Sequence, residues 1–163
     1  MALIIEDGSG VAGANSFITA VSAGTYLNGR SATWASASTT EQENALFYGG
    51  QYLNSLNWKG AKMDRDQSMI WPRHSVYDED NYLMDYDKIP YNVSAAQVEA
   101  AVYNLDGYDL FETVKPGDRI KRKKIDVLEK EFFSGAYTKR TRFDVIDGLL
   151  RGLLETLGKI TRS

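Results

Sequence analysis

The sequence contains no cysteine and a single histidine, His74. Without cysteine the chain has no disulfides, no thiolate zinc ligands and no cysteine nucleophile. The same absence fits synthesis in a reducing cytoplasm. A catalytic histidine needs an orienting partner and a nucleophile or water within reach, and the neighbours of His74 in the sequence indicate neither. We therefore expect no enzymatic activity, no metal and no cofactor.

Long apolar runs are also missing. No stretch approaches the roughly 18 apolar residues of a membrane-spanning helix, so we expect no membrane partner. The first seven residues lack a basic region and end in Glu6-Asp7, which does not fit a signal peptide. The 163 residues, 43% of them apolar, suit one domain that folds around its own core.

Charge is distributed unevenly along the chain. Residues 1–114 carry 6 Lys/Arg and 15 Asp/Glu, a net charge of -9, whereas residues 115–163 carry 13 and 7, a net charge of +6. Opposite poles suit head-to-tail contacts between subunits, or an acidic partner such as nucleic acid at the basic end. Simple solvation of both poles is the alternative.

Hydrophobic periodicity predicts a mainly α fold, a small bundle of about four helices. A capping-box spacing, Thr40 with Glu43, predicts where the second helix begins, and a leucine stripe that reaches Leu157 marks the last. The predicted helices begin and end as follows: Thr19 to Gly29, Thr40 to Leu56, Pro90 to a point before Pro116, and Thr141 to Leu157.

The remaining segments of this single domain, residues 1–163, are predicted to be irregular or extended. Glycine predicts a flexible arm or irregular loop at the N-terminus, and partial alternation with β-branched residues predicts a β-hairpin. Two tryptophans are expected to pin the long irregular segment, which includes an acidic, tyrosine-rich stretch from Tyr77 to Asp87. These segments are the arm 1–16, the irregular segment 57–90, the hairpin 118–133 and the tail 159–163.

A Gly-x-Gly-x-x-Gly pattern at residues 8–13 is similar to a dinucleotide-binding motif, but its context is wrong. Such a motif needs a helix that begins at the glycines, and the first capping signal comes later, at Thr19. Glu6 and Asp7 would repel a phosphate, and no acid follows before Glu41 to bind a ribose. We therefore do not predict a nucleotide site.

The acidic stretch 78–87 does not fit a calcium loop. Counted from Asp78, position six is Leu83 and position twelve is Ile89, where calcium loops need glycine and glutamate. A solvated loop, or one that meets a basic partner, is the better interpretation.

A basic run is the strongest electrostatic feature of the sequence, but acids lie close to it and no clear aromatic platform for bases is interleaved. The run leaves three alternatives open: a solvated strand face, non-specific contact with DNA, or a protein partner. Its residues, the candidates for DNA contact, are Arg119, Lys121, Arg122, Lys123 and Lys124.

Several motifs together resemble a family of tailed-phage virion proteins. Its members are labelled DnaT-like single-stranded-DNA-binding proteins, although a head–tail connector, or adaptor, fits the resemblance better. The resemblance covers nearly the whole chain. It rests on residues 1–17 (MALIIEDGSGVAGANSF), Trp58-Lys59-Gly60, Gln67 with Trp71-Pro72-Arg73, Ile89-Pro90 before a helix containing Ala96-Gln97, and Asp147-Gly148-Leu149-Leu150.

The resemblance implies a small helical bundle with extended arms that forms a ring, commonly twelve-fold, beneath the portal of the virion. The implied partners are the portal protein, a tail or nozzle protein, further copies of the chain and, without sequence preference, the packaged DNA. The implied location is the head–tail neck, after synthesis in the host cytoplasm.

Candidate contacts between subunits or with the portal lie in the N-terminal arm, the irregular segment and the tail. They are Leu3, Ile4, Ile5, Trp58, Trp71, Arg73, Lys159 and Arg162. The alternative function is that of a single-stranded-DNA-binding replication accessory protein.

Overall fold

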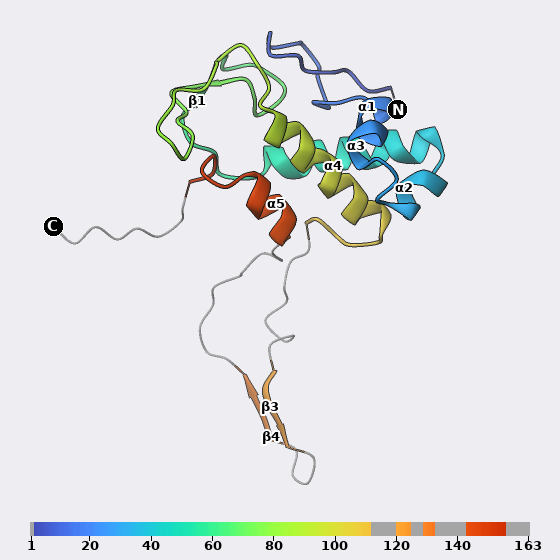
Figure 1. Ribbon diagram of the computed structural model, residues 1–163. Coiled ribbons are helices and arrows are strands. Elements are labelled where there is room, and N and C mark those ends of the chain that lie inside the picture. Colours follow the sequence, from blue (N-terminus) through green and yellow to red (C-terminus); the bar gives the residue numbers. More distant parts are fainter. Residues whose placement is uncertain (1, 112–119, 125–128, 133–142, 156–163) are drawn as a thin grey trace, which may run out of the picture. The chain divides into compact units, whose positions relative to one another are not determined.

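The computed structural model describes residues 2–111, 120–124, 129–132 and 143–155. Chain contacts divide it into two units (Figure 1): a body, Met1–Leu110 with Phe143–Ser163, and an inserted unit, Phe111–Arg142. The elements of the described residues are α1 (Ala20–Leu27), α2 (Ala32–Ser36), α3 (Thr39–Asn54), β1 (Ala61–Lys62), β2 (Arg73–His74), α4 (Tyr91–Leu105), β3 (Ile120–Lys124), β4 (Glu129–Phe132) and α5 (Asp144–Leu149).

The mainly α prediction is confirmed, and the first helix begins where the sequence predicts. The Thr19 side chain accepts a hydrogen bond from the Ser22 N–H and caps α1. Asn28, with φ 45°, ends the helix in a left-handed conformation one residue before the predicted Gly29. Helix α2 was not predicted, because five residues are too few to show a periodic pattern.

The capping box of α3 lies two residues earlier than predicted. Ser38, not Thr40, occupies the cap: its side chain accepts from the Glu41 N–H, and the Glu41 carboxylate accepts from the Ser38 N–H at 2.7 Å. Ser38 has the extended backbone that a cap requires, whereas Thr40 and Glu43 already lie inside the helix. The two possible boxes overlap in sequence, and only backbone conformation distinguishes them.

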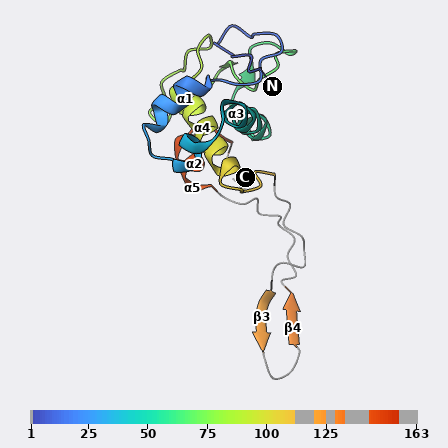
Figure 2. The ribbon, with the colours of Figure 1, turned by 90° about the vertical axis from the view of Figure 1, so that its right-hand side faces the viewer.

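Helix α4 is the centre of the body and contacts α1, α2, α3 and α5 (Figure 2). It follows Pro90 as predicted but ends at Leu105, before the predicted limit, and Gly107 with φ 87° turns the chain away. Because it is covered on several sides, apolar and small residues surround it rather than forming one stripe. Its buried residues are Val93, Ala95, Ala96, Gln97, Val98, Ala100 and Ala101.

The prediction of a long C-terminal helix is wrong. Helix α5 has only 6 residues and begins after Phe143, whereas the predicted cap, Thr141, lies outside the described residues. Gly152, with φ 81°, lies in the left-handed region and interrupts the helical pattern. Leu150 and Leu153 of the leucine stripe are therefore buried although the helix does not continue through them.

Beyond α5 the chain pairs with the start of the irregular segment instead. The Lys59 N–H donates to the Leu153 carbonyl at 3.0 Å, and the Glu155 N–H donates to the Asn57 carbonyl at 2.9 Å. Leu154 and Trp58 form an isolated antiparallel bridge. Backbone hydrogen bonds to this segment replace those that a longer helix would have made.

A two-stranded antiparallel sheet lies within the predicted hairpin, 118–133. Strands β3 and β4 place Ile120 opposite Phe132, Arg122 opposite Glu131, Lys123 opposite Lys130 and Lys124 opposite Glu129, with an irregularity between Ile120 and Arg122. The residues that join the strands, 125–128, lie outside the described residues.

The two units carry charges of opposite sign. The body holds 9 Lys/Arg and 17 Asp/Glu, a net charge of -8, and the inserted unit holds 10 and 5, a net charge of +5. Residues 143–163 belong to the body and hold three residues of each sign, so the basic excess of the C-terminal part lies in the inserted unit.

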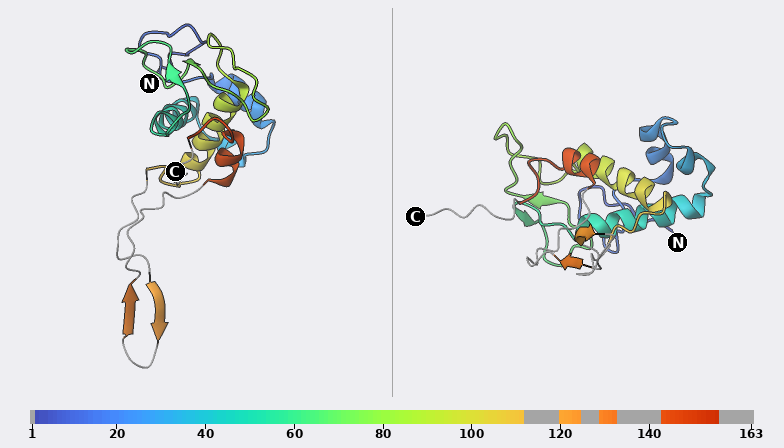
Figure 3. Two further views of the ribbon diagram at one scale, coloured as in Figure 1. Left: turned by 90° about the vertical axis from the view of Figure 1, so that its left-hand side faces the viewer. Right: turned by 90° about the horizontal axis from the view of Figure 1, so that it is seen from below.

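Helices α3 and α4 lie side by side in close contact (Figure 3). A Cβ atom at Gly49 would lie 2.7 Å from the Gln97 carbonyl oxygen, so no larger residue fits without movement. The Gln97 side chain is fully buried and donates to the Leu46 carbonyl at 2.7 Å and to the Ser16 hydroxyl at 2.9 Å. Its amide oxygen accepts from the Phe17 N–H at 2.8 Å.

We predict that Gly49→Ala lowers the free energy of unfolding by about 1–3 kcal/mol, because the added methyl group separates α3 from α4. The matched control is Gly148→Ala in α5, where a Cβ meets nothing within 4 Å. That change should stabilise the protein by roughly 0.5–1 kcal/mol through helix propensity. Denaturant unfolding of both variants measures the difference, and equal effects would contradict the close approach.

Candidate interaction surfaces

The N-terminal glycine-rich segment is an irregular loop that folds against the body, not an extended arm. Ile5 forms a bridge with Ser16, and the Glu6 N–H donates to the Ser16 carbonyl at 2.8 Å. Glu6 is 1% exposed, and its Oε1 accepts from the N–H groups of Gly8 and Gly10, both at 2.9 Å. The N–H groups that a phosphate would need thus bind the chain's own carboxylate, which supports rejection of the nucleotide motif.

Both tryptophans predicted as surface contacts are core residues instead. Trp71 is 0% and Trp58 is 5% exposed, and their rings meet edge to face with centroids 5.8 Å apart. The Trp58 indole N–H donates to the Leu53 carbonyl at the end of α3 at 2.8 Å. They pin the irregular segment to the helices, as expected, and neither presents an exposed surface to a partner.

Arg73 is also buried, and its guanidinium group holds the irregular segment together. It donates to four backbone carbonyls, those of Lys59, Ile70, Trp58 and Gly60, at 2.8–3.3 Å. Burial lowers the pKa of Arg73, and the charge of Glu155 opposes this shift. The side chain acts as a clamp for the fold, so its predicted role in portal contact does not fit its position.

The N-terminal candidates differ in exposure. Ile4 is 44% exposed, Ile5 is half-buried, and Leu3 packs against the core around α1 and α3. Arg119, Lys159 and Arg162 lie outside the described residues. The remaining basic candidates, residues 121–124, form most of β3.

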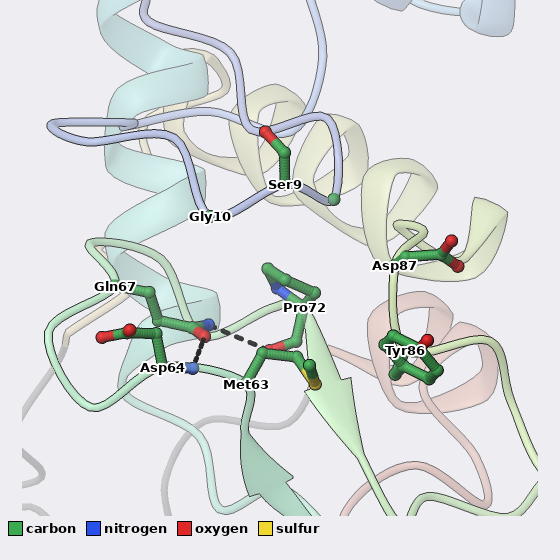
Figure 4. Close-up of a pocket in the computed structure, with 9 residues that line it drawn as sticks. Ser9, Gly10, Met63, Asp64, Gln67, Pro72, Tyr86 and Asp87 are labelled. Carbon is green, nitrogen blue, oxygen red and sulfur yellow. Dashed lines mark hydrogen bonds between the residues drawn. The ribbon is translucent and has the colours of Figure 1, made fainter.

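A shallow pocket of about 290 Å³ lies between the N-terminal loop and the irregular segment (Figure 4). Within it, the Gln67 amide donates to the Pro72 carbonyl at 3.0 Å, and its oxygen accepts from the Asp64 N–H at 2.9 Å. The carboxylates of Asp64 and Asp87 turn away from Pro72 in this view. The Gln67 amide thus stabilises the fold through hydrogen bonds to the backbone, and we assign no ligand to this pocket.

Among the described residues, no group of three or more His, Cys, Asp or Glu side chains is placed to hold a metal ion. His74 is exposed, and its Nδ1 lies 3.1 Å from the Ser75 hydroxyl. None of the described helices has the length and apolar character that crossing a membrane requires.

Several exposed large side chains of the described part of the chain lie close together in sequence on residues 77–88, which we call the tyrosine–acid loop. It contains five acids and one lysine, a net charge of -4. Four of its large side chains are largely exposed, which is unusual for a cluster of such residues. They are Tyr77 (51%), Tyr82 (72%), Leu83 (62%) and Tyr86 (58%).

The first part of the tyrosine–acid loop is a tight hairpin. Tyr77 and Leu83 pair as an antiparallel bridge, and the Met84 N–H donates to the Val76 carbonyl at 2.9 Å. The Asp78 carboxylate accepts from the Tyr82 N–H at 2.8 Å, which closes the turn. Val76 is 1% exposed and anchors the hairpin in the core.

Contacts at both ends hold the tyrosine–acid loop on the body. Gly8 lies so close to Asp87 that a Cβ would overlap the Asp87 carbonyl oxygen. Near the other end, Arg151 forms a salt bridge with Glu79 at 3.0 Å. Asp85 binds Lys88 at 2.7 Å, and this hydrogen bond raises the pKa of Lys88. The loop is therefore placed by contacts with two segments that are distant in sequence.

The sequence shows that this stretch is acidic and tyrosine-rich, but its tyrosines are not among the predicted contacts. The sequence feature that could have identified these tyrosines is the alternation of tyrosine with acidic residues between Tyr77 and Asp87. In the same segment the predicted contacts are Trp58, Trp71 and Arg73, which also belong to the motifs that carry the resemblance. In this structure they are buried, and the tyrosines are exposed.

A protein-family model described as "Putative DnaT-like ssDNA binding protein" matches residues 1–163. The chain belongs to this family. The description of the DnaT-like family names single-stranded DNA and no virion structure. No curated protein and no solved structure matches the chain.

The sign of the net charge differs between parts of the chain, which bears on where a phosphate-rich ligand would fit. Phosphates need a basic surface, and the body carries a net charge of -8. The tyrosine–acid loop offers aromatic rings for stacking, but its own net charge of -4 opposes phosphate. The inserted unit, with a net charge of +5, has the required sign.

We predict that Glu6→Ala lowers the free energy of unfolding by about 2–4 kcal/mol, because the buried N–H groups of Gly8 and Gly10 lose their acceptor. The neighbouring control, Asp7→Ala, should have a much smaller effect, since Asp7 is exposed. Denaturant unfolding measures both. Equal losses would show that the Glu6 carboxylate does not hold the loop.

Proposed function

We propose that the chain is a non-catalytic structural protein of a phage virion, a head–tail adaptor. Copies of it form a ring under the portal, bridge the portal to a tail or nozzle protein, and surround the DNA channel. This function needs surfaces that bind protein and needs no reactive site.

The observation that carries the proposal is the division of charge between the two units, -8 on the body and +5 on the inserted unit. A copy with two surfaces of opposite sign can bind the next copy head to tail. Such contacts form a closed ring when the rotation between copies closes. The resemblance of the opening segment and of the Trp71-Pro72-Arg73 turn to phage connectors adds support.

A second candidate is a single-stranded-DNA-binding accessory protein, and the family description favours it. The basic strand pair would then bind phosphates without reading sequence. The nine described residues of β3 and β4 hold five cations and two acids, a net charge of +3. Two of those cations, Arg122 and Lys124, stand opposite acids in the backbone register.

We predict that the protein forms rings when purified portal is supplied, and that negative-stain imaging shows added density on the portal. The protein alone under the same conditions is the control. A portal preparation that stays bare at high concentrations of the chain would contradict the adaptor function.

Titration with a fluorescent single-stranded oligonucleotide separates the two candidates. An adaptor should bind weakly at physiological salt. A DNA-binding accessory protein should bind at micromolar concentrations or tighter, with affinity that falls steeply as salt rises, because counterions are released. Changing all four residues 121–124 to Ser should abolish any such binding. Tight binding that this variant loses would favour the second candidate.

A further inference from the structure

The tyrosine–acid loop exposes large apolar side chains and acidic side chains that the described core does not bury. The Tyr82 side chain is 72% exposed and that of Leu83 is 62% exposed, so most of their apolar area faces water. Asp80 and Asp87 are also exposed. Clustered tyrosines rimmed by charge are typical of surfaces that bind another protein.

We infer that the tyrosine–acid loop is the docking surface for the inserted unit, residues 111–142, of a second copy of the chain. This inference rests on the proposed assembly of copies, and it names the two surfaces that meet.

Charge decides which occupant fits the loop. Its net charge of -4 excludes phosphate-rich partners and favours a cationic one. The inserted unit carries a net charge of +5, concentrated in the run 121–124, and so supplies a cationic partner of similar magnitude. The unit also contains aromatic residues, Phe132, Phe133 and Tyr137, which can contribute apolar area to such a contact.

The loop is preorganised for binding. Its hairpin hydrogen bonds, its anchor at Val76 and its close contact with Gly8 hold the backbone before any partner arrives. Tyrosine loses little conformational entropy on binding because it has only two side-chain torsions. A fixed loop therefore gains affinity that a mobile one would lose to ordering.

The two surfaces are different, so the contact is heterologous. Each copy offers one tyrosine–acid loop and one inserted unit, and each can therefore bind two neighbours. Contacts of this kind build rings or open chains, whereas a self-complementary patch stops at a dimer.

A charge-swap experiment on the full chain tests the contact. One variant carries Asp80→Lys with Asp87→Lys, and a second carries Lys121→Glu with Lys123→Glu. Sedimentation velocity at low salt measures self-association. Each variant alone should associate at least about tenfold more weakly than the wild type, a loss typical of a contact that matters. An equimolar mixture of the two should regain association, because the unaltered loop of the second variant then meets the unaltered inserted unit of the first.

The control carries Glu43→Lys with Asp66→Lys, the same change of charge at positions on the body outside the loop. It should associate like the wild type or better, and unfolding curves should show that every variant is folded. Wild-type protein that stays monomeric at low salt, or a mixture that fails to regain association, would overturn the inference. Loss of association in the control equal to that in the loop variant would overturn it as well.

The tyrosines give an independent measurement. Tyr82→Ser should weaken association about tenfold, whereas Val21→Ser, at a position on α1 that is 82% exposed, should leave it unchanged. An unaltered dissociation constant for Tyr82→Ser would mean that the loop is not the interface. Portal imaging remains a separate test: copies that associate through the loop but leave the portal bare would contradict the adaptor function alone.

Discussion

The rest of the body depends on the buried side chain of Gln97. Its amide connects three segments: α4, on which it lies, α3 through the Leu46 carbonyl, and the N-terminal loop through Ser16 and Phe17. Each of these bonds is sheltered from water, where an unmade hydrogen bond costs about 1–3 kcal/mol. Any other arrangement of α3 against α4 would leave polar groups unpaired, so this one amide fixes how the helices meet and where the N-terminal loop begins.

The position of the exposed surface follows from that core. The N-terminal loop, once placed, wraps its own backbone N–H groups around Glu6 and brings Gly8 against Asp87. The irregular segment is held from within by Arg73. A buried glutamate and a buried arginine, residue types that are usually found on surfaces, thus serve to hold two loops that contain little regular structure. The second of these loops then exposes its tyrosines to solvent.

Local signals in the sequence predicted the mainly α fold, the start of α1, the start of α4 after Pro90, and the region of β3 and β4. They failed where contacts between segments distant in sequence determine the backbone conformation or the burial of a side chain. The leucines after α5 have helical spacing, but the chain turns at Gly152 and then pairs with residues 57–59, and Leu153 is buried without a helix. Large aromatic residues marked the candidate surface, yet burial separates Trp71 from Tyr82, and composition does not reveal burial. Arg73 was misassigned for the same reason, since four carbonyls from separate positions meet it only after folding.

The inserted unit enters and leaves between Leu110 and Phe143, which both belong to the same apolar cluster of the body. Among the described residues, the core is thus closed by side chains on either side of the insertion. Lengthening such a connection raises its closure free energy by only about 0.6 kcal/mol for each doubling. Selection can therefore act on the two parts separately: the body must conserve shape, while the insertion is free to change its length and charge as its target changes.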